Sequence, residues 1–220
     1  SIVKRDATGT EAVVDSPEPV ARLLEARGVM PLPPYIKRIP NKEDHQWYQT
    51  VFAKREGAIA APTAGLHFTE ELFRRLRGAG VNVATVTLHV GPGTFKPVTT
   101  ERIEDHQMGG EVFHVSPETA TMINQTKRAG GRVLAVGTTV VRTLETVMKE
   151  QGEMVPLSGE SRLFITPGFE FKIVDTMMTN FHLPKTTLLM LVSAFAGIDQ
   201  IRGAYEEAVN ERYRFYSYGD

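Results

Sequence analysis

Strand-like segments alternate with helix-like segments along most of this chain, and this order constrains the fold more than any other feature of the sequence. β-branched residues alternate from Val81 to Val90, and the apolar run Arg132 to Val136 precedes a helix that begins at Gly137. The helical segments are about 10 to 15 residues long, a length typical of helices that connect parallel strands. We therefore expect an α/β fold with a mostly parallel sheet flanked by helices.

The N-terminal residues predict a different, β-rich structure. Ile2 to Val14 holds two alternating segments around a turn, which is the pattern of a β-hairpin. Ser16-Pro17-Glu18 then offers an N-cap, a proline at the first helical position and an early acid, so we expect a helix to Ala26. The prolines of Met30 to Pro34 fit neither a helix nor a central strand. We divide the chain into 1–29, part of a β-rich domain with a linking helix, and 30–220, an α/β domain.

Composition narrows the possible functions. The chain has no cysteine, which excludes disulfides, thiolate zinc sites and a cysteine nucleophile. Its net charge of −1 lacks the basic excess of most nucleic-acid-binding proteins, and local clusters such as Arg74, Arg75 and Arg77 are better explained as solvated helix faces. No apolar run reaches the roughly 18 residues of a membrane span, so we expect no membrane partner.

The segment Ala60 to Phe68, A-A-P-T-A-G-L-H-F, combines residue types that a plain core segment does not need. Pro62 and Gly65 impose special backbone angles, Thr63 offers a hydroxyl, and His67 titrates near neutral pH. A helix is expected directly afterwards, with Thr69 as its N-cap, and backbone amides at a helix start can hold an anion. The segment is therefore a candidate binding site.

Four histidines lie beside expected strand ends or in loops. A single histidine in such a place is usually structural, but four together favour a substrate pocket at the carboxyl ends of strands. Tight metal-binding spacings such as H-x-H or H-E-x-x-H do not occur, so we expect no metal. The four are His67, His89 before the loop glycines Gly91 and Gly93, His106 after Glu104 and Asp105, and His182 close to Asn180.

The turn Gly137-Thr138-Thr139 is a second candidate for binding an anion. It would follow a buried strand and place two hydroxyls and free amides at a helix start, with Arg142 one turn further on, an arrangement that suits a carboxylate or phosphate. Threonine capping of an ordinary βα turn explains the same residues equally well. No G-x-G-x-x-G, nucleotide P-loop or G-x-S-x-G motif is present, which argues against a standard dinucleotide site or a serine hydrolase.

Taken together, these stretches resemble the S-adenosylmethionine:tRNA ribosyltransferase-isomerase family of the queuosine pathway. The resemblance runs in order along nearly the whole chain from Met30 onward. The matching runs include M-P-L-P-P-Y-I, A-A-P-T-A-G-L-H-F, T-L-H-V-G-P-G-T-F, I-E-D-H, A-V-G-T-T-V-V-R-T-L-E, P-G-F-E-F-K, T-N-F-H-L-P-K-T-T-L and Y-R-F-Y-S-Y-G-D. The family carries about a third of its length ahead of the point where this sequence starts, and we expect that third to be absent here. The smaller, barrel-like all-β domain of the family would then be present only in part.

The resemblance implies transfer and isomerisation of the ribosyl group of S-adenosylmethionine onto 7-aminomethyl-7-deazaguanine. That base lies at the wobble position of tRNAs with a G-U-N anticodon, and the products are epoxyqueuosine in tRNA, adenine and methionine. S-adenosylmethionine would be a consumed co-substrate, with no cofactor and no metal. The resemblance also implies a cytoplasmic monomer.

This chemistry suggests roles for the candidate residues. His67, His89, His106 and His182 are candidates for the base that removes a proton, and Glu104 and Asp105 could orient it. The remaining candidates would bind substrate: Pro62, Thr63, Gly65, Gly91, Gly93, Gly137, Thr138, Thr139, Arg142 and Asn180. Of these, Thr63, Thr138, Thr139 and Asn180 offer hydrogen bonds, and the Gly137 turn or Arg142 suits the methionine carboxylate. The alternatives are an S-adenosylmethionine-dependent methyltransferase and a scaffold that binds ligand or RNA without catalysis.

Overall fold

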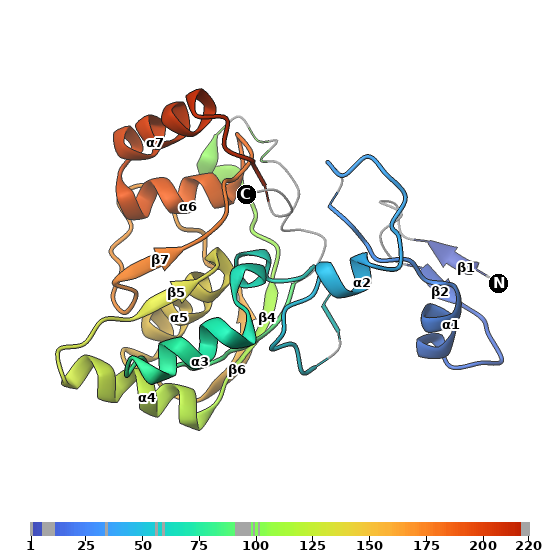
Figure 1. Cartoon of the computed structure of the whole chain (residues 1–220), viewed down its shortest axis with the longest axis horizontal. Helices are drawn as coiled ribbons and strands as arrows, with labels where there is room; N and C mark the ends of the chain where they lie inside the picture. The colour runs from blue at the N-terminus through green and yellow to red at the C-terminus, as the bar shows by residue number, and fades with distance from the viewer. Residues whose placement is uncertain are drawn as a thin grey trace. The chain divides into compact units, whose positions relative to one another are not determined.

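The computed structural model describes residues 2–5, 12–33, 35–55, 57–58, 60–90, 98, 100 and 102–216 (Figure 1). The chain divides into two compact units, residues 1–47 and residues 48–220. The division thus lies after Trp47, whereas the sequence pattern places a domain boundary after residue 29.

The first unit contains one strand pair and two helices. β1 (Ile2–Arg5) pairs antiparallel with β2 (Ala12–Val14), which confirms the predicted hairpin, although its turn lies outside the described residues. Over the described part of residues 1–47 this pair forms no barrel. Helix α1 (Val20–Arg27) begins after Pro19, later than predicted, because a residue that precedes proline is disfavoured in helical conformation. A short helix, α2 (Asp44–Trp47), ends the unit.

The second unit contains two separate sheets. β3 (Thr87–His89), β4 (Glu111–Val115) and β6 (Leu157–Ser161) form an antiparallel sheet in the order β3-β4-β6. β5 (Leu134–Val136) and β7 (Thr176–Met178) form a parallel pair. The mixture of helix and sheet agrees with prediction, but the prediction of a mostly parallel sheet was wrong. Alternating strands and helices give a parallel sheet only when each helix returns the chain to the same sheet, and here β4 and β5 belong to different sheets.

Helix α5 (Thr138–Gln151) lies at the centre of the second unit. Residues on nearly all of its faces are buried, which is typical of a helix enclosed by other elements. Its apolar residues Val141, Leu144 and Val147 join a core that includes Phe113 and Val115 of β4 and Leu191 of α6 (Thr187–Ala196). Figure 1 shows α5 beside the β5–β7 pair, with α6 and α7 (Ile198–Asn210) packed together next to β7.

The helix starts of this unit follow local sequence signals. Helix α3 (Glu70–Gly78) is capped by Thr69, whose hydroxyl accepts a hydrogen bond from the Leu72 amide at 3.1 Å. Helix α4 (Pro117–Arg128) is capped in the same way by Ser116, with proline at its first position. Helix α3 confirms the predicted N-cap at Thr69, and α4 follows the same local rule, because capping depends on residues close together in the sequence.

The segment after α7 is rich in aromatic residues, and its described part, 213–216, is not a strand. Helix α7 ends with Arg212 in the left-handed conformation, φ 57°, and the Tyr213 amide bonds back to the Ala208 carbonyl at 2.8 Å. This helix end turns the chain back, and Phe215 then packs on Phe181 with ring centroids 4.7 Å apart. Ring contacts, not strand pairing, hold this segment.

Candidate active site

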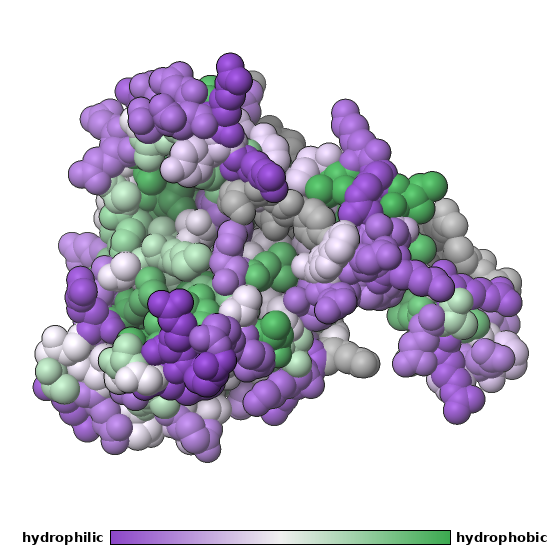
Figure 2. All heavy atoms as spheres, viewed as in Figure 1, coloured by the Kyte–Doolittle hydropathy of each residue, from purple (hydrophilic) through white to green (hydrophobic). Residues whose placement is uncertain are grey.

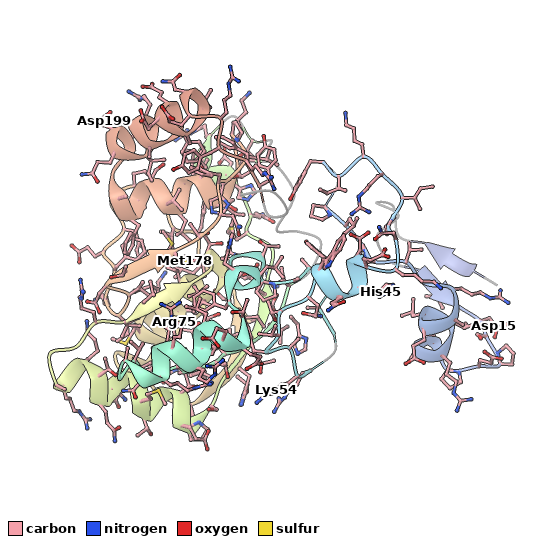
Figure 3. All side chains as sticks on the ribbon, viewed as in Figure 1. Asp15, His45, Lys54, Arg75, Met178 and Asp199 are labelled. Carbon is pink, nitrogen blue, oxygen red and sulfur yellow. The ribbon has the colours of Figure 1, made fainter. Side chains whose placement is uncertain are left out.

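The carboxyl ends of the two parallel strands carry the candidate residues that the structure brings together. β5 leads into Gly137, and β7 leads into the loop that holds Asn180 and His182. The Gly137 amide donates a hydrogen bond to the carbonyl of Met178, the last residue of β7, at 2.8 Å; Met178 is labelled in Figure 3. Two motifs far apart in the sequence therefore meet at the edge where open α/β sheets bind ligands.

The segment that contains Thr63 joins the same edge. Thr63 begins a short 3₁₀ helix, Thr63–His67, and its hydroxyl donates a hydrogen bond to Asn180 Oδ1 at 2.9 Å. Gly65 in this turn is buried, and a Cβ there would lie 2.7 Å from Cζ of Phe52. The turn therefore packs closely on Phe52, and this contact helps to place Thr63 beside Asn180.

His182 is the buried titratable group of the site. Its side chain is 9% exposed, and Nε2 lies 3.1 Å from the Thr179 hydroxyl. Burial, followed by the positive charge of Arg142, lowers the pKa of His182 from 6.5 to about 4. The imidazole is therefore neutral at pH 7. The two ring nitrogens of a neutral imidazole take different roles, one as a donor and the other as an acceptor.

Arg142 forms a buried ion pair inside the unit. Its Nη2 lies 2.5 Å from Oε2 of Glu111 on β4, and both side chains are almost fully buried. Arg142 projects from α5, so the pair joins the central helix to the antiparallel sheet. This pairing uses part of the guanidinium that the sequence assigned to a substrate carboxylate; that assignment stays a prediction.

Glu145, one turn further along α5, fixes the chain that leads into β7. Its buried carboxylate accepts hydrogen bonds from the backbone amides of Lys172, Ile173 and Val174 at 2.9 to 3.1 Å. Such bonds satisfy a buried carboxylate without a cation. Helix α5 therefore holds β7 at both ends. Glu145 bonds the residues that lead into the strand, and the Gly137 amide bonds the last residue of the strand.

The Gly137 turn is built differently from an ordinary threonine-capped turn. Gly137 has φ 98°, a conformation that favours glycine, and it occupies the N-cap of α5. No side chain caps this helix, so capping does not explain Thr138 or Thr139. Thr138 is buried and Thr139 half-buried.

The other predicted site residues lie on separate elements. His89 ends β3 and packs on Gly57, where a Cβ would lie 2.8 Å from its Nδ1. His106 packs on the ring of Phe164 with centroids 5.4 Å apart, His67 is exposed at the end of its 3₁₀ turn, and Asp105 is exposed. Pro62 precedes the turn of Thr63. Gly91, Gly93 and the side chain of Glu104 lie outside the described residues.

An open hollow of about 500 Å³ runs along β7 against α6 and α7. Met177, Met178 and Thr179 line one side, and Val192, Phe195 and Ile201 line the other. Figure 2 shows apolar surface in this region of the second unit. Thr179, which lines the hollow, also lies 3.1 Å from Nε2 of His182 through its hydroxyl.

Two residues of the site were missed by reasoning from sequence. The Tyr205 hydroxyl bonds the backbone of His182, and Glu111 pairs with Arg142. Signals for both exist: Tyr205 shares a helix face with Ile201 and Ala208, and Glu111 alternates with Phe113 and Val115 on the buried face of β4. A buried polar group on a core face requires a partner.

No cluster of three or more histidine, aspartate or glutamate side chains among the described residues could hold a metal ion. None of the helices in that part of the chain is long and apolar enough to cross a membrane.

The fold and this site define a mixed α/β protein whose polar side chains gather at the ends of parallel strands, the usual place for a small-molecule site in such folds. The chain belongs to the family described as "Queuosine biosynthesis protein", which it matches over residues 1–220. This places the chain in the family that its motifs resemble.

Individual relatives agree with the family. The chain is 58% identical over 204 residues to the S-adenosylmethionine:tRNA ribosyltransferase-isomerase of Polynucleobacter asymbioticus, covering 93% of this chain and 58% of that protein. It is also 58% identical over 199 residues to the protein of the same name from Natranaerobius thermophilus, covering 90% of this chain and 57% of the relative.

Among solved structures, the S-adenosylmethionine tRNA ribosyltransferase of Thermotoga maritima matches with a TM-score of 0.60 and 48% identity. That match covers 71% of this chain and 50% of the other. The chain thus spans 58% or less of the length of each of these three proteins.

Proposed function

We propose that the protein transfers and isomerises the ribosyl group of S-adenosylmethionine onto 7-aminomethyl-7-deazaguanine at the wobble position of tRNA. The products would be epoxyqueuosine in tRNA, adenine and methionine. The observation that carries the proposal is the hydrogen bond between Thr63 and Asn180. It joins two family-like motifs beside the buried His182, at the end of a parallel strand pair.

The first step would be removal of a proton from the carbon next to the sulfonium. A positive sulfur acidifies this C5′ proton, so a positioned base can remove it and start the loss of adenine. His67, His89, His106 and His182 are the proposed candidates, with Glu104 or Asp105 as orienting groups. With a pKa of about 4, His182 stays ready to accept a proton at pH 7 but is a weak base. This favours a hydrogen-bonding role for His182 in the pocket.

The remaining groups would stabilise charge and hold the substrate. Thr63, Asn180, Thr138 and Thr139 supply hydrogen bonds for the opened sugar and the departing adenine. The amides at the start of α5, after Gly137, suit the methionine carboxylate, since no side chain caps this helix. Arg142 would contribute through its charge, because Glu111 already accepts one of its N–H groups. Pro62, Gly65, Gly91 and Gly93 would shape the pocket walls.

The partners follow from the reaction. We propose a tRNA with a G-U-N anticodon as the acceptor and a monomer acting in the cytoplasm, where such tRNAs occur. S-adenosylmethionine would be consumed as a co-substrate, and the reaction would need neither a cofactor nor a metal.

Product analysis tests the proposal directly. The protein is incubated with S-adenosylmethionine and tRNA bearing the deazaguanine, and the small products are separated by chromatography. Free adenine and methionine support the proposal. S-adenosylhomocysteine with methylated tRNA would instead identify a methyltransferase, and binding of both substrates without turnover would identify a scaffold.

Single substitutions then test the residue roles. Thr63→Val removes the hydroxyl that bonds Asn180 but keeps the side-chain shape, so adenine release should fall at least tenfold. Thr121→Val on the exposed face of α4 is the matched control and should leave it unchanged. Replacing each of the four histidines by Gln identifies the base; full turnover in all four variants would exclude histidine base catalysis.

A further inference from the structure

An aromatic cluster lies beside the candidate site. Phe181, between Asn180 and His182 in the sequence, contacts the rings of Tyr205, Tyr213 and Phe215, with centroids 5.1, 6.3 and 4.7 Å away. Figure 1 shows the segment after α7 running beside the loop that follows β7. The segment 212–216 is thereby attached to the loop that carries two candidate site residues.

Basic residues lie close to this cluster in the sequence. Arg212 and Arg214 flank Tyr213 in the sequence, and all three are exposed, with Tyr213 at 62%. Lys185, three residues after His182, is exposed as well. Residues 211–216 contain two arginines and one acid, Glu211, so this segment carries a net positive charge. We call Lys185, Arg212, Tyr213 and Arg214 the aromatic–basic rim.

The backbone of the rim is held in unfavourable conformations. Among the described residues, three that are not glycine adopt a positive φ: Lys185 at 58°, Arg212 at 57° and Tyr216 at 72°. Two of them belong to the rim and the third follows it. Arg212 occupies the position after a helix end where glycine is strongly preferred. Such conformations cluster at binding sites, where the placement of a side chain outweighs its backbone cost.

Tyr213 has a ring face available for stacking. Its contact with Phe181 is edge-to-face, with an interplanar angle of 80°. In either sense of this geometry the Phe181 ring covers at most one face of the Tyr213 ring, and Tyr213 is 62% exposed. An exposed aromatic ring between two arginines matches the chemistry of single-stranded nucleic acid, in which bases stack and phosphates attract guanidinium groups.

We propose that the aromatic–basic rim is the surface on which an unpaired RNA loop docks next to the candidate active site. Tyr213 stacks on a base, while Arg212, Arg214 and Lys185 contact phosphates. The proposal rests on the proposed function, because that function requires a base of tRNA to reach the pocket beside Asn180 and His182. The chain has no overall basic charge, so a local rim is how it can attract RNA.

Binding of a fluorescent anticodon stem-loop RNA tests the rim. Tyr213→Ala should weaken binding about tenfold or more, whereas Tyr213→Phe should retain it because the stacking ring remains. Arg214→Gln should reduce the dependence of log Kd on log salt by roughly 0.7, the value for one lost phosphate contact on a single strand. Arg75→Gln on exposed α3, labelled in Figure 3, is the matched control and should bind as the unaltered protein does.

Two results would overturn the proposal: unchanged affinity in Tyr213→Ala, or an equal loss in Arg75→Gln. Adenine release measured on the same proteins separates this proposal from the proposed function. If Tyr213→Ala releases adenine with an unchanged KM for RNA, the rim proposal is rejected and the proposed function stands. If Tyr213→Ala weakens RNA binding but the unaltered protein releases no adenine, the rim proposal stands and the proposed function is rejected.

Discussion

The hydroxyl of Tyr205 bonds both sides of the His182 backbone. It accepts a hydrogen bond from the His182 amide at 2.6 Å and lies 3.4 Å from the carbonyl oxygen of the same residue, to which it donates. Tyr205 lies on α7, so one phenol ties the last long helix to the loop after β7. The position of the His182 ring therefore depends on a residue 23 positions away in the sequence.

Tyr205→Phe should loosen this loop while keeping the edge-to-face ring contact with Phe181. We expect a loss of about 1 to 3 kcal/mol in the free energy of unfolding, because a partly buried backbone amide loses its partner. Adenine release should fall further than this loss explains, with a larger effect on kcat than on KM. Urea unfolding and steady-state kinetics measure the two effects. Tyr213→Phe is the control for stability, and equal stabilities for the two variants would contradict the expectation.

Local signals predicted much of the second unit. Thr69 and Ser116 cap helices where their sequences indicate, because capping involves residues three positions apart. Gly137 was expected at a strand-to-helix turn, and its φ of 98° explains why glycine stands there. The hydroxyl of Thr63 bonds Asn180, two residues before His182, whereas a common substrate pocket stays a prediction.

Long-range pairing was beyond the sequence pattern. The strand at Glu111–Val115 was not predicted, and it forms the centre of the antiparallel sheet. Which strand a segment joins depends on partners that periodicity does not identify. The same limit hid the Arg142–Glu111 pair: nothing in the sequence says that these two residues, 31 positions apart, are partners, and their contact and common burial show the bond.

The buried imidazole of His182 should make stability depend on pH. Its folded-state pKa of about 4 lies below the ordinary value of 6.5, so between these values the unfolded chain binds more protons than the folded one. The stabilising contribution is complete above pH 6.5 and is lost as the pH falls toward 4, to a total of about 3 kcal/mol. Urea unfolding at pH 7 and pH 5 should show this loss, and His182→Gln should reduce it. His67→Gln, an exposed histidine of the same unit, should retain it; an unchanged pH dependence in His182→Gln would count against this origin.

Glu145→Gln should destabilise the second unit although the change is small. The carboxylate accepts three backbone amides, whereas a glutamine presents one oxygen and would turn its NH₂ group toward an amide that needs an acceptor. We expect a loss of about 2 to 4 kcal/mol, since charged hydrogen bonds are lost and a buried donor is left unsatisfied. Glu150→Gln, on the exposed end of the same helix, should change stability by less than about 0.5 kcal/mol. Hydrogen exchange at Lys172, Ile173 and Val174 locates the effect, and slow exchange at all three amides in the variant would refute it.

Two glycines should respond in opposite directions to the same added methyl group. At Gly65 a Cβ would lie 2.7 Å from the Phe52 ring and 3.2 Å from Thr50, so Gly65→Ala requires the packed turn to shift. We expect a loss of about 1 to 3 kcal/mol, the usual cost of overpacking, together with reduced adenine release because Thr63 moves away from Asn180. At Gly203, inside α7, nothing lies within 4 Å of the added Cβ, so Gly203→Ala should stabilise by about 0.5 to 1 kcal/mol through helix propensity. Thermal unfolding of both variants measures the contrast. Equal shifts in Tm would mean that the close approach of Gly65 to Phe52 does not limit this position.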